Sequence, residues 1–473
     1  MSHSNTASRS PSPTHLAYRW RFAGVLVAWL LTSHAGASPT PPNILLILVD
    51  DLGYGDLSSY GAQDLETPNI DDLVRRGMKW TSFYANCPVC SPTRAALLSG
   101  RFPDVVGVPG VIRTHSRNSW GYLLPDAELL PSALRRGGYR TAMVGKWHLG
   151  LGAPNLPNLH GFDFFHGFLG DMMDDYYNHL RHGYNYMHRN MELIEPPPTH
   201  ATDLFTDWAC QWLTSHDRNQ PFFLYLAYNA PHSPVQPPDD FHQKHRRRFP
   251  EVARERSQFA AFVEHLDDRI GQVIQTLDET GQGEDTLVVF TSDNGGSNHH
   301  GADNGTLAGQ KQDMREGGIR VPMCAVWPGR IQAGSTTDRV AMTMDLYPTL
   351  CEAAQASIED WMDGASCLPT LLGRTQPPED RTLFWVRLEG GSRYQGQPYY
   401  CVRKGPWKLT QDDASQEFEL YHLGDDPQEK VDRSGTETQV GDELRAALEV
   451  HRARCAPIPY RDSNGKGPGE IND

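Results

Sequence analysis

Apolar residues along this chain fall into two alternating patterns, one typical of strands and one typical of helices. Unbroken apolar runs favour strands that are buried on both faces of a parallel or mixed sheet. Such runs occupy residues 44–49, 139–144, 222–228 and 286–290. Between residues 262 and 277, apolar side chains instead recur with the helical period of about 3.6 residues. The alternation predicts an α/β fold in which helices cover a large, mixed, mostly parallel sheet.

The pattern changes after a proline-rich stretch at residues 375–379. Beyond it, turn residues separate short strand-like runs at residues 383–387, 399–403, 407–410 and 418–422, and an amphipathic helix is predicted at residues 442–453. A chain of 473 residues is long enough for two domains. We therefore predict a large domain at residues 40–375 and a smaller C-terminal α+β subdomain with an antiparallel sheet at residues 380–473.

The N-terminus has the pattern of a secretory signal peptide. Arg19 and Arg21 precede an apolar run at residues 22–31, and the small residues Ala35 and Ala37 form a cleavage signal. The apolar run is short for a membrane span. The pattern predicts a signal peptide at residues 1–37 and export to the periplasm or the extracellular space, without stable membrane insertion after cleavage. An uncleaved membrane anchor is the alternative.

Charge and cysteine content narrow the classes of function. The chain has 43 Lys and Arg against 58 Asp and Glu, a formal net charge of −15, which is unlike a general nucleic-acid-binding protein. A polyanionic substrate must therefore be bound by a local basic pocket. The eight cysteines are sparse and irregularly spaced, unlike a disulfide scaffold.

Reactive side chains follow each of the predicted buried strands. These side chains are Asp50 and Asp51, Lys146 and His148, His232, and finally Asp293 and Asn294. In open α/β sheets, sites form at the carboxyl ends of the strands, so we expect these groups to meet in one crevice.

Asp50, Asp51, Asp293 and Asn294 form a set of oxygen ligands. Hard oxygen ligands select calcium or magnesium over zinc or copper, and the neutral Asn294 favours calcium. The alternative is structural, because Asp-Asp can cap a turn and Asp-Asn-Gly commonly forms one.

Cys90 lies at the predicted start of a helix. Ser91 is a good helix cap and Pro92 suits the first turn, so Cys90 is placed at a helix N-terminus that favours anions. Arg94, one turn later, can reach back towards residue 90. Cys87 and Cys90 also form a C-x-x-C motif, which taken alone favours a redox pair or a disulfide.

This segment resembles the signature of the type I, formylglycine-dependent sulfatases, which are arylsulfatase-like members of the alkaline phosphatase superfamily. Cys90, Pro92 and Arg94, followed by residues 98–100, match that signature, although Thr93 and Ser99 depart from its commonest form. Further matches follow the order of the family: Asp50-Asp51, residues 145–150, 231–234 and 292–295, Lys311, and residues 316–322, 345–349 and 420–427. Several motifs in a fixed order are far more specific than any single motif.

The resemblance implies an alkaline-phosphatase-like α/β/α sandwich and hydrolysis of a sulfate ester to an alcohol and inorganic sulfate. It implies that a maturation enzyme oxidises Cys90 to Cα-formylglycine, and that one Ca²⁺ is held by Asp50, Asp51, Asp293, Asn294 and residue 90. The expected substrate is a sulfated carbohydrate or an aryl sulfate.

The resemblance also implies roles in catalysis. Arg94 and Lys146 would orient formylglycine, while Lys311 and His232 would hold the sulfate and protonate the leaving oxygen. Asp293 would help to deprotonate the attacking hydroxyl, and His148 would accept the proton of the second hydroxyl.

Other functions stay open at this point. The same site could hydrolyse phosphonates or phosphodiesters. The chain could instead bind sulfated glycans with an unmodified Cys90, or act as a thiol–disulfide enzyme at Cys87 and Cys90.

Overall fold

The computed structural model describes residues 41–114, 122–359, 361–377, 380–389 and 397–455. The chain from Pro41 onwards forms one compact unit. The predicted signal peptide at residues 1–37 lies outside the described residues. Within the described ranges, no helix combines the length and the apolar character needed to cross a membrane.

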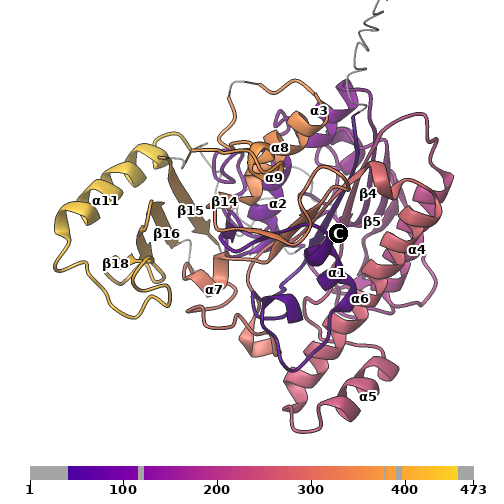
Figure 1. Cartoon of the computed structure of the whole chain (residues 1–473), viewed down its shortest axis with the longest axis horizontal. Helices are drawn as coiled ribbons and strands as arrows, with labels where there is room; N and C mark the ends of the chain where they lie inside the picture. Colours follow the sequence, from indigo (N-terminus) through magenta and orange to yellow (C-terminus); the bar gives the residue numbers. More distant parts are fainter. Residues whose placement is uncertain (1–40, 115–121, 360, 378–379, 390–396, 456–473) are drawn as a thin grey trace, which may run out of the picture. The chain divides into compact units, whose positions relative to one another are not determined.

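A mixed sheet of ten described strands forms the centre of this unit (Figure 1). Its strands in spatial order are β13 (Ser335–Thr337), β2 (Met78–Trp80), β12 (Met323–Val326), β11 (Thr286–Ser292), β1 (Asn43–Val49), β10 (Phe222–Ala227), β4 (Arg140–Lys146), β5 (Phe164–Phe168), β8 (Met187–Arg189) and β9 (Glu192–Leu193). The five central strands, β11 to β5, are parallel, and antiparallel strands flank them. Two further pairs of short strands are β3 (Phe83–Tyr84) with β14 (Ala341–Met342) and β6 (Leu180–Arg181) with β7 (Tyr184–Asn185).

The unbroken apolar runs become the buried central strands, as the sequence predicts. In β1, Leu46 pairs with Tyr225 of β10 and Val289 of β11, and all three side chains are buried. A strand that is covered on both faces has few positions for a polar side chain, which explains the absence of regular alternation in these segments.

Helices cover both faces of the sheet, with α4 and α6 on one side and α2, α3 and α8 on the other (Figure 1). The predicted helical face becomes α6, whose Phe262, Leu266, Ile270 and Val273 are buried. The helices are α1 (Pro68–Arg76), α2 (Cys90–Ser99), α3 (Leu130–Arg136), α4 (Ala201–Ser215), α5 (Asp239–Arg248), α6 (Arg254–Glu279), α7 (Glu316–Ile319), α8 (Leu346–Ala353), α9 (Leu368–Leu371) and α11 (Thr438–Arg452). Short 3-10 turns lie at Ser58–Tyr60, Pro157–His160, Gly283–Asp285, Asn298–His300 and Thr343–Asp345.

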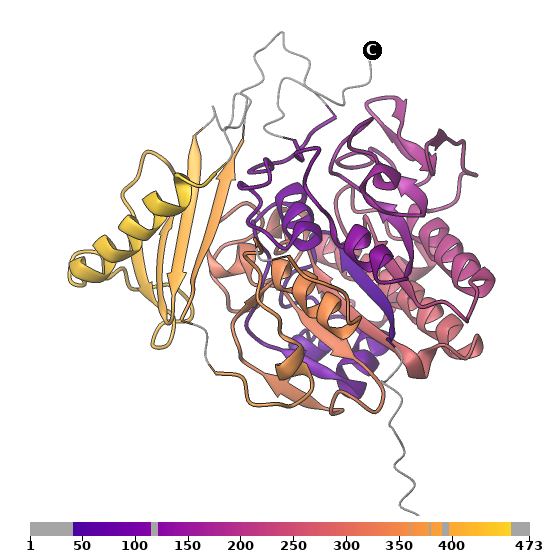
Figure 2. The same cartoon turned by 90° about the horizontal axis from the view of Figure 1, so that it is seen from above.

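The C-terminal segments form an antiparallel sheet of four strands, as predicted. The strands are β15 (Thr382–Leu388), β16 (Pro398–Lys404), β17 (Trp407–Gln411) and β18 (Glu419–His422). Figure 2 shows α11 lying across one face of this sheet, where Leu444 and Leu448 pack against Val402, Leu409 and Leu420.

The other face of the small sheet packs against segments that support the large one. Trp385 of β15 is fully buried, and its Nε1–H donates a hydrogen bond to the carbonyl oxygen of Ala85 (2.7 Å). Leu383 and Cys401 join the same apolar cluster as Ala96 of α2. The small sheet therefore forms part of the support of α2.

The side chains of β1 lie in the core, so their truncation should destabilise the protein. Leu46→Ala leaves a cavity in the centre of the sheet and should lower the free energy of unfolding by about 2–5 kcal/mol. Val450→Ala on α11, where the side chain is 68% exposed, should change it by less than about 0.5 kcal/mol. Urea unfolding of both variants measures the difference, and equal losses would contradict the buried position of β1.

Candidate active site

The carboxyl ends of four neighbouring parallel strands bring charged groups together, as the sequence predicts. Asp50 and Asp51 directly follow β1, Lys146 ends β4, and Asp293 directly follows β11. The Nζ of Lys146 lies 2.5 Å from Oδ2 of Asp50. His232, which follows β10, places Nε2 3.6 Å from Oδ2 of Asp51. Asp51 and Asp293, which are 242 residues apart, therefore share one site.

Helix α2 places Cys90 at its first position, with every side chain of the helix buried. The prediction that Ser91 caps this helix is wrong, because the helix begins at Cys90 and its cap position is Val89. The Ser91 hydroxyl lies inside the first turn and accepts a hydrogen bond from the N–H of Ile112 (3.0 Å). It therefore holds a neighbouring loop rather than the helix end.

Arg94 links α2 to the strand ends. Its Nη2 lies 2.7 Å from Oδ2 of Asp293 and 3.4 Å from Oδ2 of Asp50, and its Nη1 donates to the carbonyl oxygen of Lys146 (3.0 Å). The side chains of Arg94, Asp50 and Asp293 are fully buried. The arginine therefore holds two strand ends against the first turns of α2.

Lys311 and Asn294 both contact the carboxylate of Asp51. Lys311 Nζ lies 2.7 Å from Oδ1 of Asp51, and Asn294 Nδ2 donates to that oxygen at 2.8 Å. All the residues that the sequence analysis selected, including His148 and His232, line the cavity around Cys90 or contact these groups.

The donor set suits a hard cation. Ligand atoms of Asp50, Cys90 and Asp293 lie within 4.8 Å of one another, and so do those of Asp50, Asp51 and His232. Oδ1 of Asp50 and Oδ1 of Asn294 are buried and have no hydrogen-bond partner among the described residues. Buried oxygens without partners are costly, and a cation bound by oxygen would satisfy them. The residues present therefore fit a calcium ion.

Burial and neighbouring positive charges have opposite effects on the pKa of the acidic groups. Burial alone would raise the pKa of Asp50, but Lys146, His232 and Arg94 hold it well below its usual range. Burial and the charge of Asp50 raise the pKa of Asp293 to about 7, despite Arg94. Burial also raises the pKa of the Cys90 thiol to about 11, so an unmodified thiol is protonated at neutral pH.

Unusual backbone conformations occur at the site. Asp51 (φ 68°), His148 (φ 60°) and Gln312 (φ 84°) have left-handed conformations, which non-glycine residues rarely adopt. Gly145 (φ 108°) precedes Lys146, and a Cβ there would lie 1.9 Å from the carbonyl oxygen of Ala227. Such positions persist only where the surrounding structure enforces them, and they cluster at functional sites.

A cavity of about 200 Å³ opens above Cys90. Of the predicted residues, Asp51, Cys90, His148, His232 and Lys311 line it. The other lining residues are Val89, Val111, Arg113, Asp171, Met172, Ser233, Ser297, His300, Gln312 and Glu389. Arg113 and Glu389 form an ion pair, and the fully buried Glu389 also accepts a hydrogen bond from Arg387 Nε (2.8 Å). Arg113 and Glu389 belong to no motif and are 276 residues apart, so the sequence analysis did not find them.

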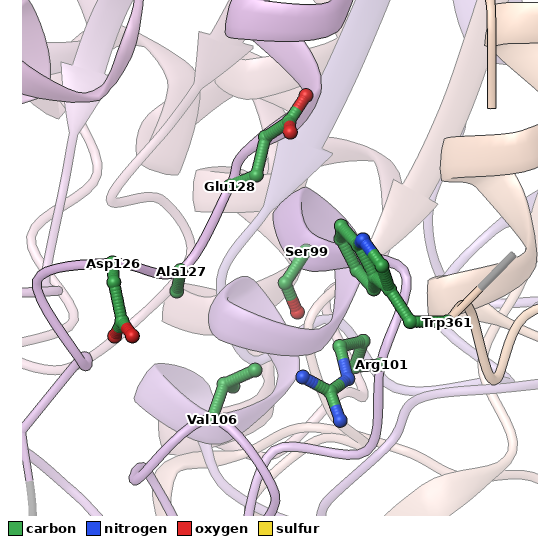
Figure 3. A pocket seen from close by; sticks show the side chains of 7 residues that line it. All are labelled: Ser99, Arg101, Val106, Asp126, Ala127, Glu128 and Trp361. Carbon is green, nitrogen blue, oxygen red and sulfur yellow. The ribbon is translucent and has the colours of Figure 1, made fainter. Parts of the chain in front are cut away.

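A second cavity, of about 240 Å³, lies at the other end of α2 (Figure 3). Ser99, Arg101 and Trp361 line it together with Val106, Asp126, Ala127 and Glu128. This set contains neither Cys90 nor the buried Asp and His groups that surround it. The reactive groups therefore belong to the first cavity.

Comparison with known proteins identifies the family. Residues 42–356 match the family model described as Sulfatase. The chain belongs to the sulfatase family. It is therefore a sulfuric ester hydrolase of the alkaline phosphatase superfamily, which confirms the resemblance seen in the motifs. In this sulfatase, residues 309–454 also match the model described as N-sulphoglucosamine sulphohydrolase, C-terminal.

Individual relatives cover most of this sulfatase. N-acetylgalactosamine-6-sulfatase of Homo sapiens is 32% identical, over 90% of this chain and 88% of that protein. Arylsulfatase A of Bos taurus is 34% identical, over 80% of this chain and 77% of that protein. The crystal structure of Ps i-CgsB in complex with k-i-k-neocarrahexaose matches with a TM-score of 0.80 and 31% identity, over 88% of this chain and 94% of that one.

The C-x-x-C motif of this sulfatase forms no disulfide. All eight cysteines lie in the described residues and are free thiols. Cys87 Sγ lies 3.5 Å from the carbonyl oxygen of Val386 in β15, and its N–H donates to Thr93 Oγ1 (3.1 Å). Cys87 thus belongs to the packing between α2 and the C-terminal sheet.

A buried charge network supports the segment that carries Lys311. Lys408 of β17 lies 2.9 Å from Oε1 of Glu316 and 2.8 Å from Oε1 of Glu429, and these side chains are almost completely buried. The N–H of Glu316 donates to Oε2 of Glu429 (2.7 Å). Burial alone would raise the pKa of Glu316, but Lys408, Arg403 and Arg320 lower it to about 2. The small sheet therefore fixes α7 just after Lys311.

Removal of the positive charge of Lys408 should destabilise the protein. Lys408→Met leaves two carboxylates buried without their cation and should lower the free energy of unfolding by about 3–5 kcal/mol. Lys404→Met disrupts an exposed ion pair with Asp380 and should cost less than about 1 kcal/mol. Urea unfolding at neutral pH checks both values, and a small loss in Lys408→Met would contradict the network.

Proposed function

We propose that this sulfatase hydrolyses a sulfate ester of a sulfated carbohydrate, with formylglycine at residue 90 and one bound calcium ion. The observation that carries the proposal is the cavity above Cys90, where Lys311 and Arg113 supply positive charge inside a protein of net charge −15. Asp51, Asp171 and Glu389 also line the cavity, so the proposed calcium ion would supply the further positive charge that a sulfated substrate needs in such a protein. The complex of Ps i-CgsB with a neocarrahexaose and the name of the human relative support a carbohydrate substrate.

Formylglycine supplies a hydrated aldehyde, with one hydroxyl for attack on sulfur and a second that permits release of sulfate. Arg94 and Lys146 are in position to orient it, because both contact Asp50 beside the first turn of α2. A maturation enzyme is required as a partner, since Cys90 is a cysteine in the encoded chain.

His148 is in position to accept a proton. Its Nε2 lies 2.8 Å from the carbonyl oxygen of Ile112, so Nε2 carries the hydrogen and Nδ1 carries a lone pair. Nδ1 is buried and has no partner among the described residues. Burial, Lys146 and Arg94 keep the pKa of His148 low, which favours this neutral form. We assign His148 the proton of the second hydroxyl.

Lys311 and His232 are in position to bind the sulfate and to protonate the leaving oxygen. Both lie beside Asp51 at the cavity, and Nδ1 of His232 donates to the carbonyl oxygen of Ser233 (2.6 Å), which directs Nε2 towards Asp51. A bound sulfate adds negative charge and favours protonation of His232 Nε2. Asp293, which accepts two hydrogen bonds from Arg94, is assigned to the attacking hydroxyl.

Calcium would be held by Asp50, Asp51, Asp293, Asn294 and residue 90. The buried oxygens without partners, described above, support this assignment. A hard cation there neutralises carboxylate repulsion and stabilises negative charge on a sulfate oxygen.

We further infer that residues 40–375 form the catalytic domain and residues 380–473 the supporting subdomain. All the residues with assigned roles precede residue 375, and Glu389 alone lines the cavity from the described part of the subdomain. Export to the periplasm or the extracellular space, after removal of residues 1–37, suits a sulfated polysaccharide substrate.

Cys90→Ala should reduce sulfate ester hydrolysis to background, a loss on the order of 10⁶-fold for a removed nucleophile. Cys87→Ala, which removes the neighbouring buried thiol, should retain turnover. Peptide mass spectrometry of the active protein should show the aldehyde at residue 90. Turnover by Cys90→Ala, or an unmodified thiol in fully active protein, would overturn the mechanism. Faster hydrolysis of a matched aryl phosphodiester than of the aryl sulfate would favour the phosphodiesterase alternative.

Chelation of divalent cations should abolish activity, and Ca²⁺ should restore it. Asp51→Asn removes one ligand charge and should raise the calcium concentration for half-maximal activity by about 10–100-fold or more. Asp217→Asn, on an exposed loop, should leave it unchanged. Full activity in the presence of a strong chelator would exclude a calcium-dependent site.

A further inference from the structure

The C-terminal end of α11 meets the loop that follows α2 through three potential metal ligands. His451 lies in the last turn of α11, Cys455 lies one turn later, and Asp104 follows α2. His451 Nε2 and Cys455 Sγ each lie 2.9 Å from Oδ2 of Asp104. Asp104 and His451 are each 2% exposed, and Cys455 is half-buried.

Aromatic packing fixes the His451 ring. The ring stacks on Phe384 with centroids 4.3 Å apart and an angle of 6° between the planes, and it meets the edge of Phe102 at 4.8 Å. An imidazole that is held on two sides keeps Nε2 directed at Asp104. The ligand direction is therefore set before any ion binds.

The donor atoms are one carboxylate oxygen, one imidazole nitrogen and one thiol sulfur, all within 4.8 Å of one another. Such a mixed set selects zinc over calcium or magnesium, which prefer oxygen. Cys455 lies in the turn that follows α11, where its Sγ is also 3.4 Å from the carbonyl oxygen of His451. We propose that Asp104, His451 and Cys455 hold a zinc ion, with water as the fourth ligand.

A second cluster of His and Asp residues in the described part of the chain differs from the Asp104 cluster in the contacts of its potential ligand atoms. His200, Asp203 and His265 also lie close together, but the backbone already engages both ring nitrogens of His200. Its Nε2 lies 3.0 Å from the carbonyl oxygen of Gln236, and its Nδ1 accepts a hydrogen bond from the N–H of Thr202 (3.2 Å). In the Asp104 cluster, each potential ligand atom contacts another potential ligand.

Zinc binding balances charge and protons. In the metal-free chain the Cys455 thiol donates to Asp104, and burial together with Asp104 raises the pKa of that thiol. Binding releases the thiol proton to solvent, and the imidazole proton moves from Nε2 to Nδ1, which no described residue contacts by a hydrogen bond. Zn²⁺ with one carboxylate and one thiolate is neutral, which suits a mostly buried site.

The consequence is a cross-link between distant segments. Asp104 and His451 are 347 residues apart, and Asp104 lies just beyond the helix that begins at Cys90. Closure of a long loop in this way removes much conformational freedom from the unfolded chain. The zinc would fasten the small subdomain to the base of α2.

The test uses the full chain carrying Cys90→Ser and saturated with calcium, so that thiolate signals cannot come from residue 90 and the result does not depend on the proposed function. After dialysis against zinc, elemental analysis should find one zinc ion per chain in this parent. Cobalt in its place should give the near-ultraviolet absorption of a cobalt–thiolate bond. Added Cys455→Ser should remove the absorption, and added His451→Asn should lower zinc affinity at least about tenfold.

Cys210→Ser provides the matched control, since Cys210 is also a half-buried thiol and lies beside Thr276 Oγ1 (3.1 Å). It should keep both the zinc and the absorption. Zinc should also raise the thermal midpoint of the parent but not that of Cys455→Ser, with circular dichroism confirming that each variant is folded. A folded parent without the cobalt–thiolate absorption, or an equal zinc content in parent and Cys455→Ser, would overturn the proposal.

Discussion

Mutual repulsion among buried carboxylates is the constraint on which this structure depends. Asp50, Asp51 and Asp293 lie almost fully buried at the ends of two adjacent strands. Unpaired charges at such positions cost several kcal/mol each. Arg94 and Lys146 supply the compensating charge from α2 and β4, and Lys311 supplies it from the segment before α7 (Figure 1). These elements must therefore lie around the strand ends, because their positive charges compensate the buried carboxylates.

The same constraint gives the small sheet a role beyond packing. It holds α7 through the Lys408 network, and it contacts the segment that precedes α2 through Trp385 and Val386. Glu389, just after β15, adds to the cavity wall. Positive groups that must meet buried acids need rigid support on the side away from the large sheet. The four antiparallel strands provide that support.

The sequence predicted most of the fold and of the reactive set, because both depend on local signals. Unbroken apolar runs located the central strands, and polar residues just after them located Asp50, Lys146 and Asp293. The N-terminal cap of α2 was misplaced by two residues, at Ser91 instead of Val89, because cap preference is a local tendency and Ser91 instead bonds to a distant loop. Arg113 and Glu389 could not be predicted, since neither belongs to a motif and only the tertiary fold brings them together.

The burial of α2 limits when an enzyme can reach the side chain of residue 90. Cys90 is 3% exposed and begins a helix whose side chains are all enclosed. Another enzyme cannot bind a side chain in that position in its active site unless the helix first unfolds. The proposed oxidation of this thiol would therefore take place while the polypeptide is still unfolded, and the proposed maturase would recognise a linear stretch of residues. Folding would then end the period in which the thiol can be modified.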